Sequence, residues 1–396
     1  MDRVDVNAMI TSMASDPAWT AEERESVSWV LSQHNLAYKQ MVEGRLRQSL
    51  STREGLLARL LALLGSGSEE HVLLQRLRLE RGELLGRVGD KDEAVAALSQ
   101  CATALRRIVE TTAPALSETP SGPSASSGSK AETKAETESN VVLRHATAKD
   151  AVHALCEALK ALGTELALVD QYHKSLDVFK ECEQVNPHPE THVFSLQLKT
   201  KIAMVWVFMI SDGGPSEEQV EQLWKLAHAL LLDIVENAGK ALEVVQGTDE
   251  RAILVDIQGE AYWRLGQLCK MIGNEAAALE NATSYVQVYD RKVTLSSLPG
   301  CMDFCELKID VGDFSVEVRD MVLQCVLVAK QAYGEGHVTY GLALQNQVSF
   351  LFRQGQFDEA IEVCKQIIHI EEASANNAGR GRMMLAFLED MKAGAK

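Results

Sequence analysis

The chain has 396 residues, of which 46% are apolar, and its 39 Lys and Arg against 56 Asp and Glu give a formal net charge of −17. An acidic surplus of this size argues against a nucleic-acid-binding surface, because contacts to phosphates need concentrated Lys and Arg. It favours a neutral or basic partner, and the chain is long enough for one extended core or two to three compact domains.

The beginning of the chain shows no targeting signal. Its first residues, MDRVDVNAMITSM, include two aspartates and lack the apolar core of a signal peptide. The longest strongly apolar run, residues 202–210, has nine residues, whereas a membrane-spanning helix needs about 20. We therefore expect a cytoplasmic protein with no membrane span.

Helices are predicted over the first 65 residues. Thr20 and Glu23 have the spacing of a capping box, and an amphipathic pattern follows toward residue 50. Leucines at 56, 57, 60, 61 and 64 then recur at helical spacing until Gly65 ends the second helix. Acidic residues interrupt the basic ones of this region, as is typical of a solvated helix face; the basic residues are Arg45, Arg47, Arg53 and Arg59.

One segment, residues 111–140, differs in composition from the rest of the chain. It is rich in Ser, Thr, Pro, Gly, Glu and Lys and has almost no large apolar residues, so burial of its side chains offers little to offset the entropy of ordering it. We predict a disordered linker there. It would separate an N-terminal helical region, residues 1–110, from a C-terminal helical region, residues 141–396.

The eight cysteines and the paired histidines do not predict a metal or disulfide site. No C-x-x-C occurs, and most cysteines fall within alanine-rich helical patterns, which favours reduced, buried thiols. His188 and His192 have a spacing that can hold a metal on a helix, but no third ligand is near in sequence. Cys301 and Cys305 are likewise an isolated pair. We expect no metal and no cofactor.

Four windows of the sequence share one layout. They cover residues 78–106, 159–187, 262–290 and 344–372. Three of them have a glycine early in the window, where a second helix would approach the first closely; these are Gly82, Gly163 and Gly266. A later glycine stands where the chain would turn between two helices with a positive φ; these are Gly89, Gly273 and Gly355.

This layout resembles the tetratricopeptide repeat family, and it is clearest in the last window, which reads LFRQGQFDEAIEVCKQII. The loop before that copy and its longer spacing are similar to the repeats of kinesin light chains. The resemblance implies an all-α fold, a TPR-like superhelical solenoid of antiparallel helix pairs. The second and third windows start 103 residues apart, at residues 159 and 262, so the solenoid should be irregular. The alternative is a generic helical bundle.

No motif of an enzyme is present. The sequence has no phosphate-binding P-loop, no dinucleotide-binding glycine motif, no nucleophile elbow and no H-E-x-x-H, so we expect a non-catalytic protein. In the resembling family the first helices of the repeats line a concave groove. Chaperone-binding members clamp a peptide carboxylate there, but Thr164 stands where the clamp has Asn, so that clamp is incomplete.

The expected function is therefore a protein interaction scaffold or adaptor that holds a peptide or helix in the groove. Two alternatives stay open: a structural subunit of a larger helical assembly, and an unrecognised enzyme, which a buried cluster of ionisable residues would favour. The groove residues implied by the resemblance are Lys160, Trp263, Arg264, Gln267, Asn346, Ser349 and Arg353.

Overall fold

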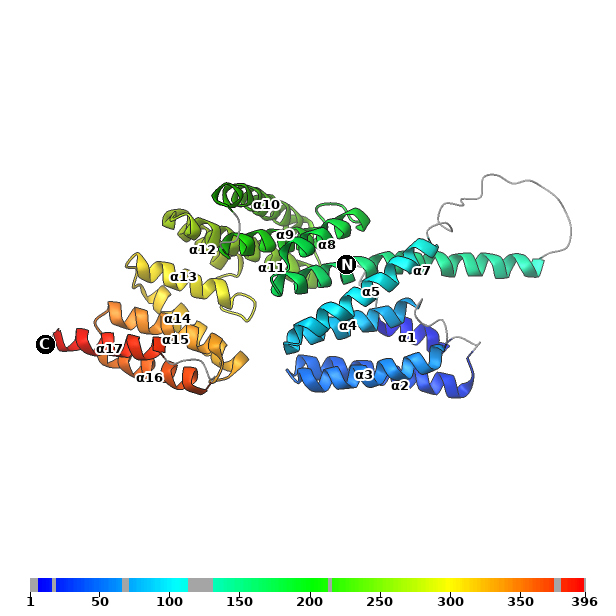
Figure 1. Cartoon of the computed structure of the whole chain (residues 1–396), viewed down its shortest axis with the longest axis horizontal. Coiled ribbons are helices and arrows are strands. Elements are labelled where there is room, and N and C mark those ends of the chain that lie inside the picture. Colours follow the sequence, from blue (N-terminus) through cyan, green and yellow to red (C-terminus); the bar gives the residue numbers. More distant parts are fainter. Residues whose placement is uncertain are drawn as a thin grey trace. The chain divides into compact units, whose positions relative to one another are not determined.

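The computed structural model describes residues 6–15, 19–65, 71–112, 131–212, 216–373 and 379–394. Within these ranges the chain forms sixteen helices and no strand (Figure 1), which confirms the prediction of an all-α fold. It divides into two compact units, Met1–Pro189 and Glu190–Lys396.

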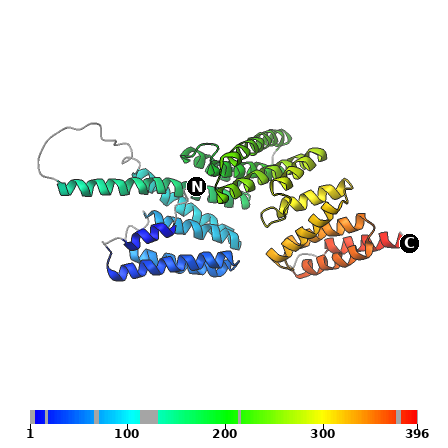
Figure 2. The ribbon, with the colours of Figure 1, turned by 180° about the vertical axis from the view of Figure 1, so that it is seen from behind.

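The first unit consists of one short helix and three antiparallel helix pairs, α2/α3, α4/α5 and α7/α8, whose members lie side by side in both views (Figures 1 and 2). Each pair also contacts the next one through its neighbouring helices, as in a repeat solenoid. The helices are α1 (Val6–Ser15), α2 (Ala21–Val42), α3 (Leu46–Leu64), α4 (Val72–Val88), α5 (Lys91–Thr112), α7 (Ala131–Leu168) and α8 (Tyr172–Val185).

The second unit continues the same architecture with the pairs α9/α10, α11/α12, α13/α14 and α15/α16, followed by a single terminal helix (Figure 1). The resemblance to tetratricopeptide repeats is therefore confirmed at the level of the fold. The helices are α9 (Val193–Ser211), α10 (Glu217–Val244), α11 (Thr248–Met271), α12 (Glu275–Val288), α13 (Leu298–Asp310), α14 (Val316–Tyr333), α15 (Val338–Arg353), α16 (Phe357–Ala373) and α17 (Gly379–Gly394).

The boundary between the units differs from the predicted one at residues 111–140. Helix α7 begins at Ala131, inside the predicted linker, and packs against α4 and α5. The reason is that one repeat leaves an apolar face that only the first helix of the next repeat can cover. The first unit therefore continues to Pro189. Residues 113–130 lie outside the described residues, so disorder there stays a prediction.

Local signals in the sequence set the ends of several helices. Thr20 caps α2 in the predicted capping box, with Glu23 bonding back to the cap backbone. The mid-repeat glycines have φ values of 101° at Gly89, 71° at Gly273 and 75° at Gly355. These are left-handed conformations, which glycine adopts without steric cost, so the predicted turns between paired helices are confirmed.

The early glycines of the repeats permit close helix contacts, but not to the same degree. A Cβ atom added to Gly163 would lie 2.4 Å from the ring of Phe179, and one added to Gly82 would lie 2.7 Å from Leu98. At Gly266 the nearest atom, a backbone oxygen, is 3.6 Å away, which is ordinary van der Waals contact. The predicted close approach is therefore tight in the first unit and looser at the third repeat.

Helix α9 is strongly apolar and largely buried. Among the described residues it is the one helix long and apolar enough to cross a membrane, and 72% of its most apolar window is buried inside the protein. It extends beyond the apolar run 202–210 in both directions. Burial on most sides is the pattern of a core helix, and α10 and α11 supply the packing.

Candidate binding site in the first unit

The residues predicted to line a groove belong to both units. Lys160 lies on α7 in the first unit, and the other six lie on α11 and α15 in the second. In the first unit Lys160 forms an ion pair of 2.8 Å with Glu157, one turn earlier on the same helix. Both side chains are largely buried, so Lys160 is part of an internal charge network.

On α11 the predicted residues are engaged with one another and with α13. The indole nitrogen of Trp263 donates a hydrogen bond of 2.6 Å to Asp303. Arg264 is only 8% exposed, stacks on the Trp263 ring at 4.4 Å and donates to Gln267 at 2.9 Å and to Glu260 at 3.3 Å. The Trp263–Asp303 bond joins α11 to α13, whereas the Arg264 contacts lie within α11, so the polar groups of these three side chains are already engaged inside the protein.

On α15 the predicted residues divide into two kinds. The Asn346 amide donates to the backbone oxygen of Met302 at 2.8 Å, which ties α15 to α13. Ser349 and Arg353 are exposed to solvent. Binding of a peptide along this face stays a prediction, with Ser349 and Arg353 as its accessible contacts.

The first unit contains a cavity that sequence reasoning did not identify. It has a volume of about 620 Å³ and lies mainly between the first helices of the repeats, with walls from α1, α2, α3, α4 and α7. Charged side chains of both signs converge on it. They are Arg53, Arg76, Glu80, Glu83, Arg87 and Glu157.

A buried ionic chain forms one wall of the cavity. The guanidinium of Arg53, only 4% exposed, donates to the Glu80 carboxylate. His34 Nε2 lies 3.1 Å from the same carboxylate, and its Nδ1 lies 2.9 Å from the Asn7 side-chain oxygen. Burial alone would raise the pKa of Glu80, but the hydrogen bond with His34 and the charge of Arg53 outweigh it, so the pKa is lowered. Glu80 therefore stays ionised.

Two further carboxyl groups line the cavity, Glu83 on α4 and Glu157 on α7, and their pKa values are shifted in opposite directions. Burial would raise the pKa of Glu157, but the charge and hydrogen bond of Lys160 hold it below its usual range. Glu83 reaches solvent inside the cavity although protein surrounds it, and its pKa is raised, first by burial and then by the Glu157 charge. Glu83 is thus the more readily protonated of the two.

Arg76 on α4 is the least satisfied charge of this site. It is 8% exposed, and its Nε has no hydrogen-bond acceptor among the described residues. Its positive charge lowers the pKa of Glu157, so it lies within electrostatic reach of that carboxylate. A buried donor that lacks an acceptor is costly, and the Arg76 side chain also forms part of the cavity wall.

The prediction from sequence was wrong for one residue of this site, Arg53. The four arginines between residues 45 and 59 were expected on a solvated face, and Arg45, Arg47 and Arg59 are indeed exposed, but Arg53 is buried. Its partner Glu80 is 27 residues away, so no local spacing could have paired them. The reason for burial is the packing of α4 over α3.

The raised pKa of Glu83 leads to a testable pH dependence. The folded pKa lies above the unfolded value, so the Glu83 carboxyl binds its proton more tightly in the folded state. The free energy of unfolding therefore falls as the pH rises from the unfolded pKa through the folded pKa. We expect Glu83→Gln to raise the melting temperature at pH 7 and to have little effect below the unfolded pKa of about 4.3. The other charges that act on Glu83 are Glu157, Lys160, Arg87 and Glu80.

Thermal unfolding followed by circular dichroism at pH 7 and pH 4 checks this expectation. An unchanged or lower melting temperature for the variant at pH 7 would contradict it.

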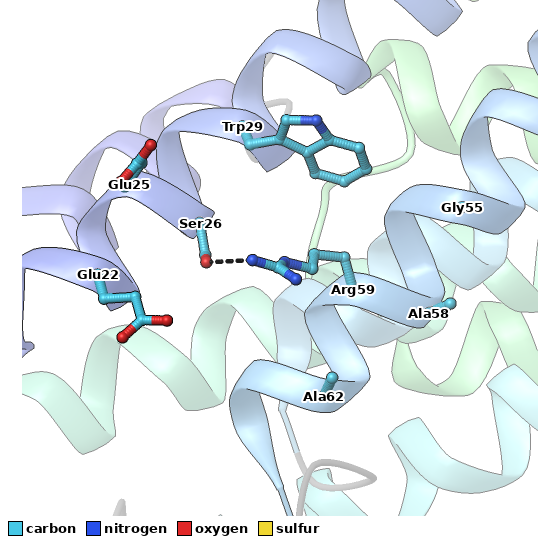
Figure 3. Close-up of a pocket in the computed structure, with 8 residues that line it drawn as sticks. All are labelled: Glu22, Glu25, Ser26, Trp29, Gly55, Ala58, Arg59 and Ala62. Carbon is cyan, nitrogen blue, oxygen red and sulfur yellow. Dashed lines mark hydrogen bonds between the residues drawn. The ribbon is translucent and has the colours of Figure 1, made fainter.

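A second hollow of about 720 Å³ lies on the outer surface between α2 and α3 (Figure 3). Trp29, which is 43% exposed, stands above Arg59, and Arg59 donates to Ser26 at 2.8 Å. Its walls are otherwise small or acidic exposed residues such as Ala58 and Glu22. This hollow is larger than the inner cavity, but no buried charged side chain lines it. The inner cavity is therefore the stronger candidate for a binding site.

No protein-family model matches the sequence, and no curated protein matches it. Similar solved structures include the Podosopora anserina putative kinesin light chain with nearly identical TPR-like repeats, at 14% identity and a TM-score of 0.39, covering 56% of this chain and 96% of that one. The apo form of RapI has 9% identity and a TM-score of 0.39, covering 93% and 97% of the two chains.

Human IFIT1, solved as a dimer with m7Gppp-AAAA, has 12% identity and a TM-score of 0.37, covering 98% of this chain and 94% of that one. With TM-scores this low, the repeat architecture of the chain rests on its own helix pairs and glycine turns.

Proposed function

We propose that the chain is a non-catalytic binding scaffold of the cytoplasm whose first unit holds a peptide segment of a partner protein in the cavity of 620 Å³. The observation that carries this proposal is the set of buried charges on the cavity wall. Arg53 and Arg76 each have a buried Nε without a protein acceptor among the described residues. Both side chains line the cavity, and acceptor oxygens of a ligand would form charge-assisted interactions with these cations.

The lining indicates the kind of ligand. Three arginines and three glutamates face the cavity, so a segment with polar groups of both signs fits better than a purely apolar one. The acidic surplus of the whole chain favours a protein partner over a nucleic acid, whose phosphates it would repel. Peptide main chain supplies both donors and acceptors at regular spacing.

Selection from a display library of random 12-residue peptides on the full-length chain tests the proposal. The peptides that are enriched are then measured on a double variant of the cavity rim, Tyr38→Ala with Arg87→Ala. Both side chains line the cavity and are exposed, so their removal should leave the fold intact. We expect a loss of affinity of at least about tenfold, equivalent to about 1.4 kcal/mol.

The matched control is Trp29→Ala, which truncates an exposed aromatic residue in the outer hollow of the same unit. It should leave the affinity of the selected peptides unchanged. Failure to enrich any peptide, or peptides that bind the rim double variant as tightly as the native chain, would remove the basis of the proposal.

The enzyme alternative has one observation in its favour, namely the ionisable cluster of the cavity. Catalysis would need a group free to exchange protons, whereas Glu80 is held ionised by Arg53 and both ring nitrogens of His34 lie against hydrogen-bonding partners. Glu83, with its raised pKa, is the remaining candidate base. A bound peptide that mass spectrometry finds cleaved or modified by the native chain, but not by Glu83→Gln, would favour an enzyme.

A further inference from the structure

Helix α1 is seated on the side of the first unit that carries the cavity. It packs against α2 and α4, the first helices of the first two pairs. Its Val6 and Ile10 are buried, and Met9 and Met13 pack beside them in the same apolar cluster. These positions recur every three to four residues, so they form a single stripe of the helix.

The surface beneath α1 is an apolar groove with a polar end. Val27 and Val30 of α2 and Leu73 and Leu77 of α4 belong to the cluster that receives the stripe. At the end of the groove Asn7 meets His34 at 2.9 Å, and Val6 and Asn7 form part of the cavity wall. The groove therefore recognises a short amphipathic helix through apolar side chains and one polar side chain.

Helix α1 is also joined to α2 by the Asn7 amide, which donates to the Asn35 side-chain oxygen at 3.2 Å, and by a short chain link. It has ten residues, and helices of that length are marginal in isolation, so docking and helix formation depend on each other. The link to α2 is short, residues 16–20, which gives α1 an effective concentration on the order of millimolar at the groove. A partner helix must compete against that concentration.

We infer that the groove between α2 and α4 is a docking site for an amphipathic helix of a partner protein and that α1 is its displaceable intrachain occupant. The partner helix would carry large apolar residues at i, i+3, i+4 and i+7, as Val6, Met9, Ile10 and Met13 do, and a polar residue at i+1 to meet His34. This inference rests on the proposed role of the first unit as a binding surface, and it adds the class of partner.

Fluorescence anisotropy with a capped, labelled peptide of residues 6–15 tests the inference. The peptide is titrated with the full-length native chain and with the full-length variant Ile10→Asp, which places a charge on the buried side of α1. Because the variant frees the groove, we expect the peptide to bind it on the order of tenfold more tightly than the native chain. A peptide that itself carries Ile10→Asp should not bind.

The matched control is Thr11→Asp in the chain, because Thr11 lies on the exposed side of α1. It should behave as the native chain does. Equal binding of the peptide to the native chain and to the Ile10→Asp variant would overturn the inference, as would the absence of binding to that variant at about 2 mM peptide, a concentration comparable with that of a tethered helix.

Hydrogen exchange on the native chain tests the same inference without requiring any variant to fold. Saturating peptide should speed the exchange of the α1 amides and leave those of α7 unchanged; unaltered exchange in α1 would also overturn the inference. Peptides selected by display that bind the cavity rim while the peptide of residues 6–15 fails to displace α1 would leave the proposed function standing and refute this inference alone.

Discussion

Replacement of Glu80 by Gln is expected to lower the free energy of unfolding by about 3 kcal/mol at pH 7. The carboxylate accepts from Arg53, which is 4% exposed, and lies 3.1 Å from His34 Nε2. Without its charge the Arg53 guanidinium stays buried with no ionic partner. We expect a value at the lower end of the range for broken buried pairs because the Glu80 side chain is 25% exposed.

The effect should depend on pH in a defined direction. The folded pKa of Glu80 is lowered, so its contribution is fully present above the unfolded pKa of about 4.3 and is lost as the pH falls through the folded pKa. Urea denaturation at pH 7 and at pH 3 should therefore show a large difference between native chain and variant at pH 7 and a smaller one at pH 3.

An exposed pair provides the control for Glu80. Glu54, whose side chain is 49% exposed, pairs with Arg81 at 3.0 Å, and Glu54→Gln should change the unfolding free energy by less than about 1 kcal/mol. If both variants proved equally mild, the buried ionic chain would have no special role in the stability of the first unit.

Two glycine substitutions are expected to differ in their effect on stability. Gly163→Ala should lower stability by about 1–3 kcal/mol, because its Cβ would lie 2.4 Å from the ring of Phe179, which is fully buried. Gly266→Ala meets no atom closer than 3.6 Å. It should be neutral or stabilising by up to about 1 kcal/mol, because alanine favours the helix interior over glycine.

Paired denaturation curves of the two glycine variants check this contrast. In a solenoid the damage from Gly163→Ala should be felt mainly in the adjacent repeats of the first unit. Equal midpoints for the two variants would mean that the Phe179 ring moves aside without cost and that the contact at Gly163 does not constrain the α7/α8 pair.

The helical class and much of the repeat layout follow from the sequence by itself. Caps such as Thr20 with Glu23 and turn glycines such as Gly89 and Gly355 act within a few residues of where they stand. Helix ends and helical periodicity are local properties of the chain. The sequence by itself therefore determined which segments form helices and where the first helix of a repeat with a turn glycine ends.

Only the tertiary structure decided where the units divide and where the candidate site lies. Arg53 looks like any solvated arginine until α4 packs over it and brings Glu80 from 27 residues away, and His34 joins the same carboxylate across 46 residues. Likewise no pattern in α1 reveals that it lies against α2 and α4. Burial and long-range ion pairing depend on which helix faces meet, and those contacts join residues too distant in sequence for local spacing to relate.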